Sequence, residues 1–180
     1  MLRERLEKQQ FSNEYAIVDG VRMHEEHGAN FRIPPPIIKR KVGVGQFVEL
    51  RIDSPRFSVH EEDAAKCSCP SCNGELAKPI LRHEQPRSIL PLPDQQVPSR
   101  GWGEDFWCEV LQRDGDVLLG RIDNPLVENK LHGLGLNDQL LFREENILAL
   151  HPSHRLEIVS AMRVEELKEL AEWLGEQGNA

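Results

Sequence analysis

The sequence predicts a mainly β (α+β) fold: a small curled sheet or SH3-like barrel with a zinc-knuckle insertion and a C-terminal amphipathic helix. Three observations predict it. Short segments alternate apolar and polar residues, a cysteine- and proline-rich stretch interrupts them, and the last segment has a helical period. We place the barrel domain at residues 29–160, its insertion at 54–101 and the helix at 161–180.

The first strand is expected between Gln46 and Ile52. Val48, Leu50 and Ile52 alternate there with larger or charged residues, the pattern of a strand with one buried face. Before it, the run from Asn30 to Pro36 is expected to be an extended strap, because proline disfavours helix in the residue that precedes it.

A β-hairpin is the clearest structural feature of the sequence. Phe106, Cys108 and Val110 alternate with Trp107, Glu109 and Leu111; the dipeptide Asp114-Gly115 supplies a tight turn, and the chain returns from Val117 to Ile122. Shorter strands are expected at residues 139–142 and 147–150, with a further one at 156–159. The first ten residues leave two alternatives open, a short surface helix or a frayed end.

The last segment repeats its apolar residues at helical spacing. Val164, Leu167, Leu170, Ala171 and Leu174 fall on one face, and glutamates occupy most of the rest. We expect this face to pack on the barrel of the same chain. Pairing with a helix of a partner is the alternative.

Composition restricts the classes of function. The chain has 180 residues, of which 39% are hydrophobic and 29% charged, as in an ordinary globular protein. It has no run of about 20 apolar residues and begins with a charged segment, so we expect a cytoplasmic protein without a membrane segment. The net charge of −8 disfavours nucleic acid as a partner, and Lys39-Arg40-Lys41 is too small a basic cluster to reverse this.

Several segments together resemble a group of small bacterial domains of unknown function. The matching segments are Phe31-Arg32-Ile33-Pro34, Val42 to Leu50, Phe106 to Val110, Gly120 to Pro125, Leu136 to Phe142 and Asn146 to Leu148. The group has an F-x-I-P strap, a W-V-x-V strand, a G-x-L-x-N-x-P turn and an L-G-D-x-I-x-F ending, and some relatives look like immunity proteins. The resemblance implies a barrel over residues 30–150. This chain departs from the pattern in its cysteine-rich insertion and in Cys108, where the group has valine.

The insertion contains a cysteine cluster with metal-ligand spacing. Cys69 and Cys72 have the spacing of a zinc knuckle, Cys67 adds a third sulfur, and we expect His83 to complete a tetrahedral site. His60 and Cys108 are the alternative fourth ligands, although Cys108 is more simply a small core residue. Reduced, unligated thiols are a second interpretation of the cluster and a disulfide a third.

Three sulfurs favour a structural zinc ion over a catalytic one, which needs an open position for water. His24-Glu25-Glu26-His27 has the wrong spacing for a helical zinc-protease motif, and no nucleophile elbow or phosphate loop is found. His151 and His154 flank a proline and serine, where solvated histidines are expected.

Trp102, Asp123 and Asn124 are the candidate binding residues, because a large aromatic between glycines and a polar turn are typical of contacts at a barrel mouth. We therefore expect a non-enzymatic, cytoplasmic module that is stabilised by structural zinc, binds another protein and is immunity-like. The alternative is a zinc-dependent hydrolase or transferase that uses the Cys67, Cys69 and Cys72 ion. A zinc-knuckle nucleic-acid binder is disfavoured by charge.

Overall fold

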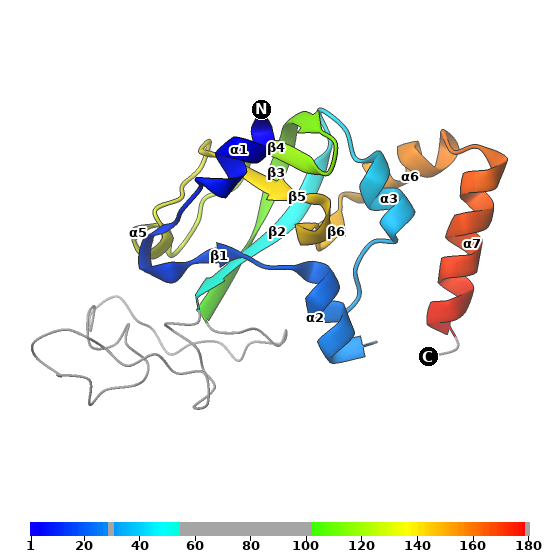
Figure 1. The fold of residues 1–180 in the computed structure, drawn as a ribbon, viewed down its shortest axis with the longest axis horizontal. Coiled ribbons are helices and arrows are strands. Elements are labelled where there is room, and N and C mark those ends of the chain that lie inside the picture. The colour runs from blue at the N-terminus through cyan, green and yellow to red at the C-terminus, as the bar shows by residue number, and fades with distance from the viewer. Residues whose placement is uncertain (29–30, 55–101, 179–180) are drawn as a thin grey trace, which may run out of the picture.

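The computed structural model describes residues 1–28, 31–54 and 102–178 (Figure 1). They form an antiparallel, nearly closed barrel with helices at its edges, as the sequence predicts in outline. The strands are β1 (Ala16–Ile17), β2 (Phe47–Ser54), β3 (Trp102–Asp114), β4 (Val117–Ile122), β5 (Gln139–Arg143) and β6 (Ala149–Leu150). The α-helices are α1 (Leu2–Glu7), α2 (Gly20–His27), α3 (Pro36–Lys41), α5 (Asn129–His132), α6 (Pro152–Ser160) and α7 (Val164–Gly178), and the 3-10 turns are η1 (Ser12–Glu14) and η5 (Glu144–Asn146).

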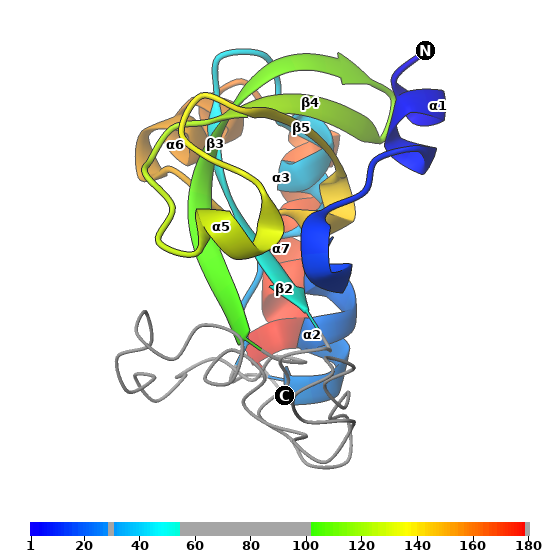
Figure 2. The same ribbon diagram turned by 90° about the vertical axis from the view of Figure 1, so that its left-hand side faces the viewer.

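The sheet closes because its first long strand accepts neighbours on both edges. The strand order is β1-β2-β3-β4-β5, and β6 pairs with the same β2. β1 and β6 share one edge of β2: Ile17 lies opposite Ile52, whereas Leu150 lies opposite Val48. The short η5 turn after β5 therefore returns the chain to β2 and curls the sheet (Figure 2). Since β1 belongs to the sheet, the sheet begins before residue 29.

The predicted alternation of β2 and β3 is confirmed by burial. Val48, Leu50 and Ile52 are completely buried, and so is Cys108, as expected of a small core residue. The hairpin is also confirmed, with Asp114 opposite Val117 and Gly115 at positive φ in the turn. Burial raises the pKa of the Cys108 thiol to about 12, with Asp123 and Glu109 adding to the effect, so this thiol stays protonated.

The first ten residues form a helix that covers the sheet. Leu2 of α1 is buried against Val117, Leu119 and Leu141, on the face of β4 and β5 that points away from the barrel core. Leu6 packs there as well, and Gln9 exchanges hydrogen bonds with the backbone of Leu141. Of the two alternatives the sequence left open, the surface helix is therefore the one the structure contains.

One expected element is one residue too long, and another is wrong. The extended strap ends at Pro35, because Pro36 is the first residue of α3, a position where the fixed φ of proline suits a helix and its missing N–H costs nothing. The expected strand at 156–159 is part of helix α6, which begins in the same way at Pro152. Leu156 is 70% exposed there, so the apolar residues of this segment do not share one buried strand face.

The C-terminal helix is present, and its apolar face is only half covered. Leu170 packs against the barrel core, as expected, but Leu167 is 40% exposed and Leu174 is 54% exposed. α7 contacts α3 and stands at the edge of the molecule (Figure 1). In the part of the chain that the structure describes, no helix is both long and apolar enough to cross a bilayer.

Candidate functional site

A row of four aromatic rings crosses the outer side of β2 and β3. The His151 ring lies edge-on to Trp107 with centroids 6.0 Å apart, His154 follows 5.8 Å from His151, and Phe47 stacks on His154 at 5.8 Å. We call the surface formed by Phe47, Glu49, Trp107, His151 and His154 the Trp107 face.

The sheet positions the two ends of this row. Phe47 and Trp107 belong to the face of each strand that points away from the core, and Trp107 lies directly opposite Glu49 in the β2–β3 register. Both aromatic side chains are half-buried. The Trp107 ring thus projects from β3, a strand that pairs with both β2 and β4, and the barrel fixes its position.

The two histidines come from the beginning of α6. The backbone N–H of His151 donates to the carbonyl of Phe47 at 3.1 Å, which anchors this end of the helix to β2. His151 Nδ1 lies 2.8 Å from Ser153 Oγ, and His154 Nδ1 lies 3.0 Å from Glu157 Oε2. His151 is exposed, as expected, but His154 is half-buried because its ring covers Phe47.

Two of the predicted binding residues border this face. The backbone N–H of Trp107 donates to Asn124 Oδ1 at 2.7 Å, and that of Asp123 donates to the Trp107 carbonyl at 2.9 Å. Asn124 therefore positions Trp107, since its side-chain oxygen extends the pairing of β3 beyond the end of β4. Asp123 is exposed.

The third predicted residue lies elsewhere. Trp102 is the first residue of β3 and pairs with Ser54, five residues along the strand from the Trp107–Glu49 pair. At about 3.3 Å per residue this is a separation of roughly 16 Å. The structure describes only the backbone of Trp102, and it brings Asp123 and Asn124 together with Trp107 instead.

The carboxylate of Glu49 gives the Trp107 face an acidic character. Its side chain is half-buried, and burial, followed by the negative charge of Asp105, raises the pKa of Glu49 above its ordinary value. Within the described residues, Glu49 has no lysine or arginine at ion-pair distance, whereas Asp105 is paired with Arg51 at 2.8 Å and Glu109 with Arg121. A cation placed beside Trp107 would therefore meet an unneutralised carboxylate.

A second ionisable cluster lies inside the molecule. The fully buried side chain of His132 approaches Glu104 with Nε2 3.3 Å from Oε2, and its Nδ1 accepts a hydrogen bond from the N–H of Leu134. Glu104 also accepts from the N–H groups of Val127, at 2.6 Å, and Glu128, at 3.0 Å. Burial alone raises the pKa of Glu104, but the hydrogen bonds from His132 and these two N–H groups outweigh it, so the pKa lies below its usual range. The cluster joins α5 to β3 and is closed to solvent at His132, as a structural pair would be.

The predicted zinc ligands Cys67, Cys69, Cys72 and His83 lie outside the described residues, as does the alternative His60. Across residues 1–28, 31–54 and 102–178, no group of three or more histidine, cysteine or acidic side chains is arranged to hold a metal ion. The basic cluster of the sequence has a structural role here: Lys39 is buried, and Arg40 and Lys41 pair with Glu169 and Glu166 of α7.

Sequence reasoning placed none of the five residues of the Trp107 face among the binding residues. The available signal was a large aromatic at Phe47 on the side of β2 that alternation assigns to solvent. Comparisons with protein-family models, with curated proteins and with solved structures each found no match to this chain.

Proposed function

We propose that this chain is a cytoplasmic, non-enzymatic binding module that engages another protein through the Trp107 face. The observation that carries the proposal is the continuous row of four rings on the sheet, next to the carboxylate of Glu49, which has no cationic partner among the described residues. Aromatic side chains at fixed positions provide much of the binding energy at protein interfaces, because they bury large areas and lose little conformational entropy.

The partner's contacting side chain is a lysine or arginine. A cation over the Trp107 ring gains a cation–π interaction, and the carboxylate of Glu49 directly across the strand pair supplies the countercharge. The raised pKa of Glu49 fits this role, because a nearby cation would stabilise the charged form that burial disfavours.

Capture from a lysate of the host, compared between variants, tests this function. Wild-type protein is expected to retain a specific protein that Trp107→Ala and Glu49→Gln lose, with circular dichroism unchanged. Val127→Ala is the matched control, since Val127 is an 83% exposed apolar residue outside the face. Equal capture by wild type, Trp107→Ala and Glu49→Gln would refute the proposal.

The same proposal includes a structural zinc ion held by Cys67, Cys69, Cys72 and His83. The support for this ion is the spacing of the cysteines in the sequence, which is that of a zinc knuckle. Elemental analysis is expected to give about one zinc per chain, lost in Cys69→Ser and Cys72→Ser and retained in Cys108→Ser, whose thiol lies in the core.

The zinc-dependent hydrolase or transferase is the competing function, and the same variants separate the two. Metal-dependent turnover that Cys69→Ser abolishes in folded protein would replace the binding module with the enzyme. The resemblance to small bacterial domains, some of them immunity-like, agrees with a protein partner and stays a prediction.

A further inference from the structure

One side of α7 carries an exposed apolar seam that spans two heptads. Val164, Leu167, Ala171 and Leu174 follow one another at spacings of three, four and three residues, the a and d positions of a helix pair. All four are exposed: Val164 by 63%, Leu167 by 40% and Leu174 by 54%, with Ala171 exposed as well. We call these four residues the α7 seam.

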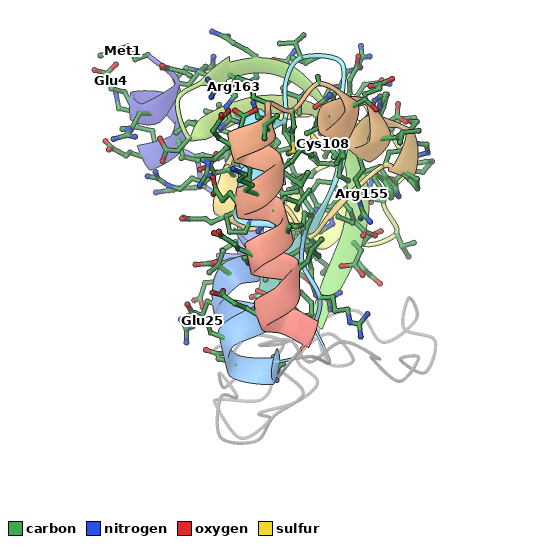
Figure 3. All side chains as sticks on the ribbon, turned by 90° about the vertical axis from the view of Figure 1, so that its right-hand side faces the viewer. Met1, Glu4, Glu25, Cys108, Arg155 and Arg163 are labelled. Carbon is green, nitrogen blue, oxygen red and sulfur yellow. The ribbon has the colours of Figure 1, made fainter. Side chains whose placement is uncertain are left out.

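Residues outside the seam attach α7 to the molecule, although Leu174 also lines a groove between α7 and α6. Leu170 packs on the core and Trp173 is half-buried. Lys41 Nζ lies 2.8 Å from Glu166 Oε1, and Arg40 pairs with Glu169. Figure 3 views α7 from its outer side, with the barrel behind it.

The charges of α7 permit pairing with another copy of itself. The helix is acidic, but its glutamates lie at the outer b, c and f positions: Glu165, Glu166, Glu169, Glu172 and Glu176. Within Val164–Gly178 the e and g positions that flank the seam hold Lys168, Leu170, Gly175 and Gln177. Glutamates at these positions would repel those of a second copy, and none of the four is a glutamate.

A groove beside the seam has the complementary charge. It has a volume of about 720 Å³ and lies between α7, α6, α2 and the strap, with Leu170, Trp173 and Leu174 on its α7 side. Arg32 and Arg155, both exposed, line it. Among the described residues neither arginine has a carboxylate at ion-pair distance, in contrast to Arg40 and Arg163, which pair with glutamates of α7 (Figure 3 labels Arg155 and Arg163).

We propose that two copies of this chain pair through the α7 seam, with the acidic helix of each copy beside the arginine-lined groove of the other. The surface is self-complementary, since it combines an exposed seam, glutamates displaced from it and two arginines that have no carboxylate partner among the described residues. Such isologous contacts generate two-fold dimers, the commonest oligomers. The proposal is independent of the proposed function, but a dimer would present two Trp107 faces and bind a repeated target more tightly.

Sedimentation over a range from about 5 to 200 μM tests the proposal on the whole chain. Wild type is expected to shift with concentration from 20.6 kDa towards twice that mass. Leu167→Glu and Leu174→Glu place a charge in the seam and are expected to weaken the dimer at least tenfold. Because both positions are exposed, neither change disturbs the monomer. Val127→Glu, at an apolar residue that is 83% exposed and lies outside the seam, is the control.

Two arginine variants test the contribution of charge to the dimer. Arg155→Glu is expected to weaken the dimer several-fold, whereas Arg5→Glu, on α1 and likewise exposed without an ion pair among the described residues, should not. A monomer at 200 μM, a dimer insensitive to the two leucine changes, or equal effects of the two arginine changes would each overturn the proposal. A wild-type monomer that binds an added acidic amphipathic peptide would assign the seam to another protein.

Discussion

The barrel and α7 bury their apolar residues to very different degrees. In β2 the inward side chains of Val48, Leu50 and Ile52 are completely buried, whereas Leu167 and Leu174 of α7 remain 40% and 54% exposed. β2 is hydrogen-bonded to three other strands. α7 is attached through Leu170, a half-buried tryptophan and two ion pairs on the surface.

The difference indicates that the two regions have separate stabilities. Burial and backbone pairing make the barrel one cooperative unit, while surface ion pairs contribute little and are screened by salt. We therefore expect changes in the barrel to destabilise the whole molecule, including α7. Changes at the base of α7 should release the helix and leave the barrel intact.

The largest loss of stability is expected from Glu104→Ala. The change leaves the buried His132 and the N–H groups of Val127 and Glu128 without their acceptor, which should cost about 3 kcal/mol of unfolding free energy. Glu104→Gln keeps an acceptor and should cost less. Urea unfolding followed by circular dichroism measures both, and an unchanged midpoint for Glu104→Ala would contradict the structural role of this cluster.

The contribution of the Glu104–His132 pair to the stability of the fold should depend on pH. Because the folded pKa of Glu104 is lowered, its contribution is fully present above the ordinary glutamate pKa of about 4.3 and is lost as pH falls through the folded value. Wild type and Glu104→Gln should therefore approach each other in stability below about pH 4. A constant difference between pH 7 and pH 3 would exclude this linkage.

Gly120→Ala is expected to cost about 2 kcal/mol, since it overfills the core. A Cβ at Gly120 would collide with the Cys108 sulfur and lie 2.9 Å from Phe142 Cε1. The double variant Gly120→Ala with Cys108→Ala removes that sulfur and should recover part of the loss in thermal unfolding. No recovery would show that the backbone oxygen of Glu109, 3.2 Å away, limits the site instead.

Lys41→Ala is expected to have a smaller effect on stability, and this effect should be confined to α7. Hydrogen bonds from Lys41 and then from Arg163 lower the pKa of Glu166 to about 2. Its contribution is therefore complete above about pH 4.3 and disappears as pH falls towards 2. Hydrogen exchange should become faster in α7 for Lys41→Ala, and for wild type at low pH, with β2 and β3 unchanged. Equal acceleration in the barrel would remove the distinction between the two regions.

Glu49→Gln should have the smallest effect on stability, and this variant should be slightly more stable than the wild type. The folded pKa of Glu49 is raised by burial and by Asp105, so the charged form weakens the fold as pH rises through that value. At pH 7 the neutral amide should raise Tm slightly, because the carboxylate is only half-buried and solvent screens it. A lower Tm would mean that Glu49 has a stabilising cation.

The sequence by itself determined the strands β2 to β5 in outline and the inward position of Cys108, but not the short strand β1. Alternation with period two in Phe106, Cys108 and Val110 reflects a local constraint, because successive side chains of any strand point to opposite faces. The turn at Asp114-Gly115 is equally local, since glycine adopts the positive φ that the turn needs. The same holds for α7, whose 3.6-residue period is independent of its surroundings.

Only the tertiary structure decided what those elements meet. Pro36 and Pro152 begin helices because the chain after them finds packing partners, which proline alone does not specify. The row from Trp107 to Phe47 joins residues about 60 positions apart, brought together by the β2–β3 register and by the return of the chain to β2 through β6. The sequence also did not determine which apolar residues of α7 are buried. Their burial depends on where Lys41 and Arg40, which pair with α7, lie in space, and the period of the helix does not specify this.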